Sequence, residues 1–276
     1  MIYNMFMEEF IKSHLVSQVV LRQFAVKTVV KTDDGKKKYK YETTVHNKET
    51  DATELCDVEN VAYLKVAKKA IAELEQQWSH DIEKDTKSAI NSIANNNWTD
   101  KHIGVVKDLM ALHFIRSQAF ALVGNNTKYI INILEARKNE VVAVYPEYTD
   151  IINQKYVEAI KTAPLEVAID ILKTYITKTK KYLADTSVGL EIGEAPDNAE
   201  FVIGDTPVIT MTKAGDISVP ITEAEYVAMP ITPKYLVALK KNPDKRKPVK
   251  LTKQQVENAN NKQKRLARTS YFSIPE

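Results

Sequence analysis

The chain has 276 residues, 44% of them hydrophobic, which is enough for one large or two small domains with a substantial core. Its 39 basic and 36 acidic residues leave a net charge of only +3, so any affinity for nucleic acid must come from a local basic patch. It has only seven glycines, and the strings G-x-x-x-x-G-K-[ST] and G-x-G-x-x-G do not occur. The composition therefore argues against nucleotide binding of these two types.

The cysteine content and the N-terminal segment bear on the compartment. Cys56 is the single cysteine and cannot form an intramolecular disulfide, and no Cys/His cluster has zinc-finger spacing. The opening MIYNMFMEEFIKSHL is interrupted by charged residues and does not resemble a signal peptide. No window approaches the ~18–20 apolar residues of a membrane span. We therefore expect a cytoplasmic protein without a membrane partner.

Two elements are predicted before residue 50. Apolar residues recur at helical spacing between His14 and Val26, which predicts a buried helix with Ser13 as its cap. The segment KTVVKTDDGKKKYKYETTVH alternates aromatic and β-branched residues with charges around Asp34-Gly35, which predicts a β-hairpin. Lysines around its tip protect edge strands in many proteins, and contact with nucleic acid is the alternative. These lysines are Lys31, Lys36, Lys37, Lys38 and Lys40.

The middle of the chain is predicted to be helical. Residues 65–95 carry a periodic apolar face that ends at three asparagines. A second long helix is expected from about Asp100 to Val123, with Thr99 or Asp100 as its cap and Gly124-Asn125-Asn126 as its end. Further helices are expected over about 128–138, 147–162 and 165–183, the last one beginning just after Pro164.

The composition shifts after Asp185 to short β-rich runs separated by proline, glycine and asparagine, which predicts a small antiparallel sheet. The LTKQQ segment then predicts a capped final helix with a basic end. Because no long linker separates these parts, we predict a single α+β domain over 1–276, mainly helical, with an N-terminal β-hairpin and the small C-terminal sheet. Its parts are a helical core over about 60–185, a β-rich segment over about 186–240 and a C-terminal helix over about 251–268.

Several short strings, in the same order along the chain, resemble one family. The segment from His14 to Phe24 is similar to H-Y-V-P/S-Q-x-x-L-R-x-F, and Phe201 to Val208 is similar to F-x-x-S-D-x-P-V. The later strings include Met229 to Pro233, which is similar to P-L-S-P. The family is the domain of unknown function four-two-three-eight, found in bacteria and phages. The resemblance implies a site that shares an N-terminal histidine and Asp205, and it implies no activity.

Two positions depart from the family pattern. Gly204 stands where the family usually has serine, and Val19 stands where it usually has an aromatic residue. A hydroxyl required beside the acid would therefore be missing.

Several ionisable or amide side chains are embedded in apolar segments and are candidates for a site. The predicted catalytic residues are His14, Asp205 and Glu83. The predicted substrate-binding residues are Arg22, Arg116, His113 and Gln18. A carboxylate that orients an imidazole is suited to acid–base catalysis, and an arginine beside it would stabilise negative charge on a phosphate or carbonyl group.

Each candidate also has a structural explanation. Gly204-Asp205-Thr206-Pro207 is typical of a bend, in which the carboxylate accepts backbone hydrogen bonds. Arg22 would need Glu83 or Asp205 as an ion-pair partner if it were buried. Mg²⁺ would find only Glu83 and Asp205 as obvious oxygen ligands, so metal dependence has little support and the cofactor stays undetermined.

The sequence leads to three hypotheses about function. The first is an intracellular effector that acts on RNA, DNA or a nucleotide through a His/Asp/Arg site, such as a nuclease, a toxin-like protein or a phage-defence protein. The phage context comes only from the family. The alternative is a non-catalytic module that binds a protein or ligand and whose embedded charges hold the fold. A third possibility is an oligomer interface built from some of the 13 tyrosines.

Overall fold

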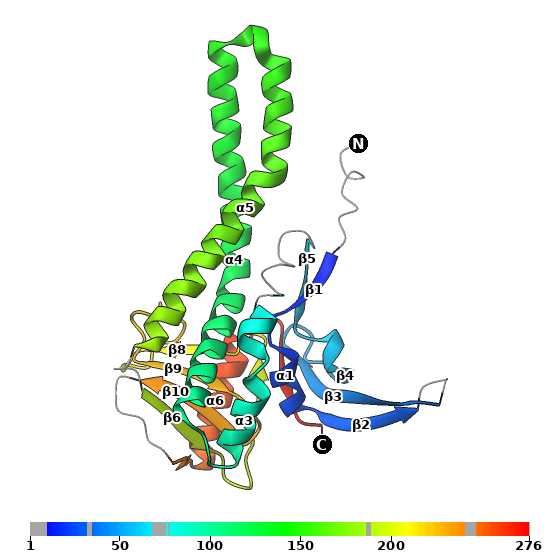
Figure 1. The fold of residues 1–276 in the computed structure, drawn as a ribbon, viewed down its shortest axis with the longest axis vertical. Helices are drawn as coiled ribbons and strands as arrows, with labels where there is room; N and C mark the ends of the chain where they lie inside the picture. The colour runs from blue at the N-terminus through cyan, green and yellow to red at the C-terminus, as the bar shows by residue number, and fades with distance from the viewer. Residues whose placement is uncertain are drawn as a thin grey trace.

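The computed structural model describes residues 10–31, 35–67, 76, 78–185, 189–240 and 247–275. These residues form an α+β fold with a sheet-containing body and a long helical hairpin that rises from it (Figure 1). The helices are α1 (Gln18–Leu21), α3 (Thr86–Ala94), α4 (Asp100–Val144), α5 (Thr149–Ala184) and α6 (Lys253–Leu266). Short turns of 3₁₀-helix are η1 (Arg22–Phe24), η2 (Val58–Asn60) and η4 (Pro146–Tyr148), and η3 (Ser79–Glu83) is a π-helical turn.

One sheet joins three strands of the first half of the chain with two strands of the second half, and β1 (Phe10–His14) and β5 (Tyr63–Ala67) form a separate two-stranded sheet. The first sheet has the order β2-β3-β12-β7, and β4 pairs with β3 outside this path. Its members are β2 (Val26–Lys31), β3 (Lys37–Asn47), β4 (Thr53–Asp57), β7 (Ile203–Gly204) and β12 (Ser270–Ser273). Because β12 pairs antiparallel with both β3 and β7, the beginning, the β-rich segment and the end of the chain meet here.

A second sheet has the order β11-β6-β10-β9-β8. Its strands are β6 (Gly189–Glu194), β8 (Ile209–Met211), β9 (Tyr226–Pro230), β10 (Tyr235–Lys240) and β11 (Val249–Lys250). The pairing is antiparallel except for β11, which runs parallel to β6. The predicted C-terminal sheet is therefore mixed, and it lacks β7, which joins the sheet of the hairpin strands instead.

The predicted β-hairpin is confirmed, since β2 and β3 pair antiparallel from Val26–Glu42 to Lys31–Lys37. The central aspartate of its turn lies outside the described residues. The final helix is also confirmed. Thr252 caps α6 by accepting a hydrogen bond from the Gln255 amide, as expected of a polar N-cap residue.

The predicted helix between His14 and Val26 is only partly correct. Residues Phe10–His14 form β1, which pairs with β5 (Tyr63–Ala67), and the helix is limited to α1 followed by η1. Ser17, not Ser13, is the N-cap residue. The predicted helix over 65–95 is wrong at its start for the same reason, because its first residues pair with β1 in a strand. Residues 68–75 and 77 lie outside the described part of the chain.

The two long helices merge segments that were predicted separately. Helix α4 continues through Gly124-Asn125-Asn126 to Val144, and α5 runs through Pro164 to Ala184. The two helices pack against each other over much of their length, and such packing outweighs weak local stop signals. A proline inside a helix removes one backbone hydrogen bond and favours a kink, and α5 changes direction midway (Figure 1).

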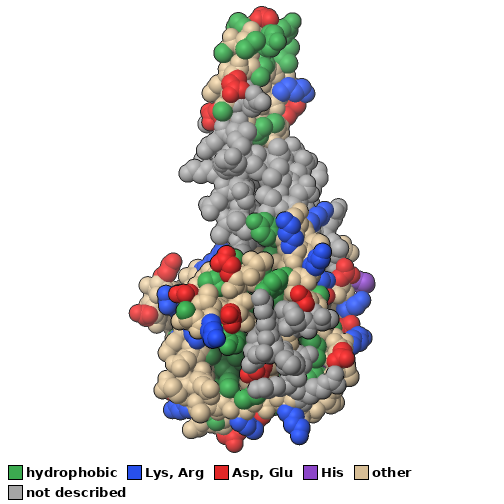
Figure 2. All heavy atoms as spheres, turned by 90° about the vertical axis from the view of Figure 1, so that its left-hand side faces the viewer, with side chains coloured by type: hydrophobic (Ala, Val, Ile, Leu, Met, Phe, Trp, Pro, Cys, Tyr) green, Lys and Arg blue, Asp and Glu red, His purple; other side chains and the backbone are tan. Residues whose placement is uncertain are grey.

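Apolar side chains are exposed at the far end of this helical hairpin, where Figure 2 shows them gathered at its tip. They include Val144, Tyr145, Tyr148 and Ile151. The buried core lies instead in the body, where α1, α3 and the first turns of α4 pack over the sheets. Its largest fully buried side chains include Phe24, Ile93, Leu109, Phe201 and Phe272. The candidate site is built around this core.

Candidate functional site

A buried ion pair joins two of the predicted residues. The Arg116 guanidinium donates from Nη1 to Glu83 Oε1 at 2.7 Å and to Ser17 Oγ at 3.1 Å. The Ser17 hydroxyl also donates to Glu83 Oε1. Arg116 is almost completely buried, whereas the Glu83 side chain keeps 20% of its surface exposed. Burial works to raise the pKa of Glu83, but the Arg116 charge and the hydrogen bonds outweigh it and hold this pKa below its ordinary value.

His113 is locked as a neutral imidazole beside this pair. Its Nδ1–H donates to the Leu109 carbonyl at 2.8 Å, and its Nε2 accepts from the Ser17 amide at 2.9 Å. The ring is fully buried. Burial first, and then the Arg116 charge, lower its pKa to about 4. Since both ring nitrogens are occupied, His113 holds Ser17 in place and offers no lone pair to a substrate.

His14, Gln18 and Arg22 form a second chain of contacts. The Gln18 amide nitrogen donates to His14 Nε2 at 3.0 Å, and its amide oxygen accepts from Arg22 Nη2 at 3.1 Å. The His14 ring makes an edge contact with Tyr63, with ring centres 6.1 Å apart. Arg22 is exposed, so the buried arginine that pairs with Glu83 is Arg116, contrary to the structural pairing predicted for Arg22.

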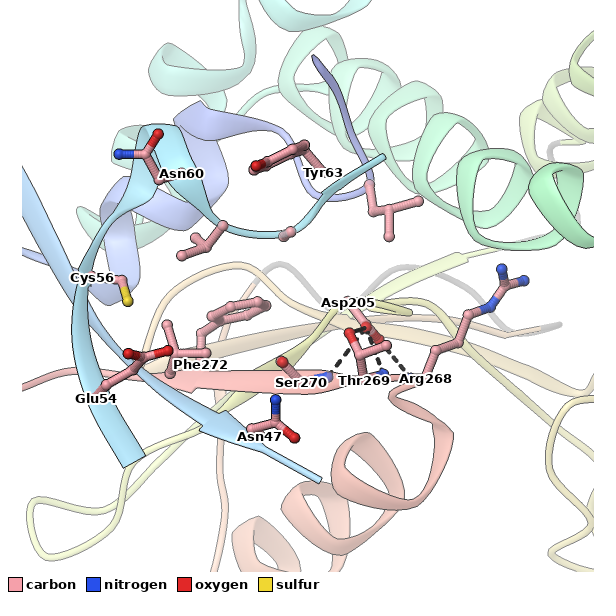
Figure 3. Close-up of a pocket in the computed structure, with 14 residues that line it drawn as sticks. Asn47, Glu54, Cys56, Asn60, Tyr63, Asp205, Arg268, Thr269, Ser270 and Phe272 are labelled. Atoms are coloured by element: carbon pink, nitrogen blue, oxygen red, sulfur yellow. Dashed lines mark hydrogen bonds between the residues drawn. The ribbon is translucent and has the colours of Figure 1, made fainter. Parts of the chain in front are cut away.

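Asp205 binds the backbone that follows α6 (Figure 3). Its Oδ1 accepts from the Arg268 amide at 2.6 Å, and its Oδ2 accepts from the amides of Thr269 and Ser270 and from the Thr269 hydroxyl at 2.8–3.2 Å. The residue is only 2% exposed. None of these donors is an imidazole, so the carboxylate does not orient His14. It orders the turn between α6 and β12, so its role is structural, but its donors lie 63–65 residues away and not within the Gly204–Pro207 bend, as the structural alternative expected.

Gly204 has a steric role next to this carboxylate. Its amide donates to Gln263 Oε1 at 2.8 Å. An added Cβ would lie 3.1 Å from both the Ala267 Cβ and the Gln263 carbonyl oxygen. The close approach of α6 to β7 therefore explains why this chain has no serine hydroxyl here.

A cavity of about 340 Å³ lies on one face of the β2-β3-β12-β7 sheet. Asn47, Glu54, Cys56, Ser270 and Phe272 form one side of it (Figure 3). Residues directly opposite in a sheet point to the same face, and the register pairs Asn47 with Ser270. These side chains therefore form a floor that strands from both ends of the chain build together.

The opposite side of the cavity comes from the N-terminal part of the chain. Asn60 and Tyr63 lie across the cavity from the floor, while Asp205 and Arg268 stand at one end (Figure 3). Leu15, Val61 and Ala62 also line the cavity. A hydrogen bond of 2.7 Å from the Leu15 amide to the Ala62 carbonyl joins these two N-terminal segments, which we call the roof of the cavity. The first segment of the chain thus lies beside the late β-rich segment. This volume and this mixture of apolar, amide and charged groups are typical of a small-ligand site.

Cys56 lines the cavity as a thiol. Burial and the neighbouring Glu54 carboxylate raise its pKa above the ordinary value. A thiolate is the reactive form, so Cys56 is not activated as a nucleophile. As the single cysteine of the chain, it is nevertheless a natural reporter of what occupies the cavity.

The predicted site residues thus fall into three groups. Glu83, His113 and Arg116 surround Ser17, and His14, Gln18 and Arg22 follow in a chain that begins next to the cavity residue Tyr63. Asp205 lies in the cavity wall. Within the described residues, no group of three or more His, Cys, Asp and Glu side chains is placed to hold a metal ion.

Sequence reasoning missed Ser17, Tyr63 and Arg268. Ser17 had a signal, because it lies inside the string that resembles the family. Tyr63 and Arg268 had none, since only the folded chain brings η2, β5 and the end of α6 to one cavity.

The fold and the site together define an α+β protein with a ligand-sized cavity on a sheet face. A family model described as protein of unknown function (DUF4238) matches residues 12–273, and the chain belongs to this family, as its sequence strings indicated. No curated protein and no solved structure matches it. Across the described residues, no helix combines the length and the apolar character needed to cross a membrane.

Proposed function

We propose that this protein binds a nucleotide, or the end of a nucleic acid, in the sheet-face cavity. The observation that carries the proposal is the cavity itself, of about 340 Å³, which is lined by the Tyr63 ring and by Asn47 and Asn60. Aromatic faces suit a base, and amides and the Glu54 carboxylate suit the hydrogen-bonding groups of a base and a sugar. Arg268 at one end is exposed, and the guanidinium N–H groups that it does not donate to the Ser117 carbonyl would meet a phosphate.

The partners of the buried charges favour binding over catalysis by the predicted pair. Asp205 is engaged by four donors, Glu83 by Arg116 and Ser17, and His113 through both ring nitrogens. Charges with this degree of internal pairing hold a fold together. The proposed protein is therefore a non-catalytic binding module, which is the alternative that the sequence predicts. Its ligand is of the nucleotide type that the sequence predicts for the effector.

The rate of Cys56 modification tests this proposal directly. An aromatic disulfide reagent at pH 8 should modify Cys56 slowly, and a bound nucleoside or nucleotide should slow it further and raise the melting temperature. Leu15→Trp, which fills the cavity from the roof, should remove the dependence on ligand. If none of the common nucleosides, nucleotides or short oligonucleotides changes either readout, the proposal is wrong.

A second candidate is an enzyme that acts on RNA, DNA or a nucleotide, as a nuclease, toxin or phage-defence effector. The observation that favours it is His14, whose Nε2 is fixed by Gln18 and whose ring contacts the cavity residue Tyr63. A positioned neutral imidazole can serve as an acid or base. Total RNA and plasmid DNA, with and without Mg²⁺, should be degraded by the native protein and not by His14→Ala. Intact substrate in every arm counts against this candidate.

A further inference from the structure

One face of the β2–β3 ribbon combines cations with aromatic rings. The register places Lys27 opposite Tyr41, Val29 opposite Tyr39 and Lys31 opposite Lys37. Residues opposite one another point to the same face, and side chains alternate along each strand. This basic aromatic face consists of Lys27, Lys31, Lys37, Tyr39 and Tyr41, together with Arg22.

Each tyrosine ring has a cation beside it. Lys27 Nζ lies 3.7 Å from the centre of the Tyr39 ring, and the Arg22 guanidinium carbon lies 4.9 Å from the centre of the Tyr41 ring. The Tyr39 side chain is 54% exposed. An exposed ring flanked by positive charges can stack on a base while the cations meet the adjacent phosphates.

The charge distribution differs between the two faces of the ribbon. On the opposite face Lys40 is paired with Glu42 at 2.7 Å, whereas no acidic residue belongs to the register positions of the basic aromatic face. Lys31 and Lys37 stand directly opposite each other, an arrangement of like charges that destabilises a sheet. Lysines that protect an edge strand explain some of this charge, but they do not explain an exposed tyrosine and the 55% exposed Val29 on the same face. A polyanion with flat rings would relieve the repulsion and cover these side chains.

The same sheet face carries the cavity. Along β3, every second side chain points to the same face, so the face of Tyr39 and Tyr41 continues to Val45 and Asn47, which line the cavity. Val45 lies six positions after Tyr39, which corresponds to roughly 20 Å of strand. A chain molecule on the ribbon is therefore aligned with the cavity floor.

We propose that single-stranded RNA or DNA binds along the basic aromatic face, with a base on the exposed Tyr39 ring and its phosphates at the surrounding cations. This inference rests on the proposed nucleotide function and extends it from a cavity ligand to a polymer. An acidic protein partner is the competing occupant, and it is an outcome of the test below.

Fluorescence anisotropy with labelled oligo-dT, oligo-rU and an acidic peptide measures binding on the native chain. Tyr39→Ala should weaken oligonucleotide binding by about tenfold, and Tyr39→Phe, which keeps the ring, should retain it. The double variant Lys31→Gln/Lys37→Gln should weaken binding and lower the slope of log affinity against log salt by about 1.4, which is about 0.7 for each lysine. The matched variant Lys38→Gln/Lys40→Gln removes the same charge from the opposite face and should bind as the native protein does. Comparison of oligo-dT with oligo-rU identifies the preferred nucleic acid.

Equal losses in the two lysine pairs, an unchanged affinity in Tyr39→Ala, or tighter binding of the acidic peptide would overturn the proposal. Protection of Cys56 by mononucleotides separates the two functions. If mononucleotides protect Cys56 but the Tyr39 and Lys31/Lys37 variants bind oligonucleotides as the native protein does, this inference fails and the cavity function stands. If oligonucleotides need Tyr39 while no mononucleotide protects Cys56, the cavity function fails and the ribbon remains a binding surface.

Discussion

The backbone amide of Ser17 donates a hydrogen bond of 2.9 Å to Nε2 of His113, 96 residues further along the chain. The same serine donates its hydroxyl hydrogen to Glu83. One residue at the start of α1 therefore connects η3 and α4 and occupies Nε2 of a buried histidine, whose pKa is lowered by burial and by Arg116. The stability of this junction depends on pH in a direction that the contacts determine.

Acidification should destabilise the protein through His113. Its pKa is about 4 in the folded chain against 6.5 for an unperturbed histidine, because burial and Arg116 disfavour the charged form. The unfolded chain therefore binds the extra proton first, and this contribution is complete above pH 6.5 and lost as the pH falls towards 4. The expected loss is about 3 kcal/mol, measured by urea unfolding at a series of pH values.

His113→Gln is the control for this effect. Glutamine does not titrate, so the variant should be less stable at pH 7 but should lose less stability between pH 6.5 and 4.5. Glu83, the acidic neighbour, has a lowered pKa, so its own contribution disappears only at still lower pH. Parallel pH curves for the two proteins would show that His113 does not titrate on unfolding.

Removal of one partner of the Glu83–Arg116 pair should be costly. Glu83→Ala leaves a guanidinium that is 97% buried without its carboxylate, and the expected loss is about 3 kcal/mol. Arg116→Ala should lose a similar amount, and the double variant should lose clearly less than the sum. Trp78, whose ring centre lies 5.4 Å from the Arg116 guanidinium, reports the unfolding by fluorescence. Additive losses would mean that the two groups are not energetically coupled.

Asp205 and its neighbour Thr206 should respond in opposite ways to the loss of polar atoms. In the native chain, backbone N–H groups donate to both oxygens of the Asp205 carboxylate. Asp205→Asn replaces one of these oxygens by an NH₂ group, which cannot accept from them, and we expect the free energy of unfolding to fall by about 2–4 kcal/mol. The Thr206 hydroxyl is buried and has no hydrogen-bond partner among the described residues. Thr206→Val should therefore keep or slightly raise the melting temperature. An Asp205→Asn variant with native stability would point to a role outside the fold.

Local patterns predicted those elements whose pairing is local. The β2–β3 hairpin and α6 were identified because a turn and a capping box lie within a few residues of the segments they organise. The strand nature of β1 was not predictable, since its partner β5 begins 49 residues after His14. The asparagines near Gly124 failed as a stop signal because packing against α5 sustains the helix. Long-range pairing leaves little trace in a local window.

The candidate site shows the same limit. Embedded charges indicated burial correctly for Glu83, Arg116, His113 and Asp205, which lie within the body, but not for Arg22, which is exposed. Their partners could not be read from the sequence, because the donors to Asp205 are backbone amides 63–65 residues away. Backbone amides carry no side-chain signature. The pairing of His14 with Asp205 followed from the family resemblance and from residue types, and neither of them reveals such donors.

The departure from the family pattern at position 204 leads to the last prediction. Gly204→Ala places a methyl group 3.1 Å from the Ala267 Cβ and from the Gln263 carbonyl oxygen, closer than side chains normally pack, so α6 must shift. We expect a loss of about 1–3 kcal/mol in urea unfolding. Ala267→Gly removes one of the three close contacts, the other two being the Gln263 carbonyl oxygen and Oε1, so the cost of Gly204→Ala should be smaller in that background than in the native chain. An equal cost in both backgrounds would attribute the effect to Gln263, and no cost in either would mean that a serine fits beside Asp205 after all.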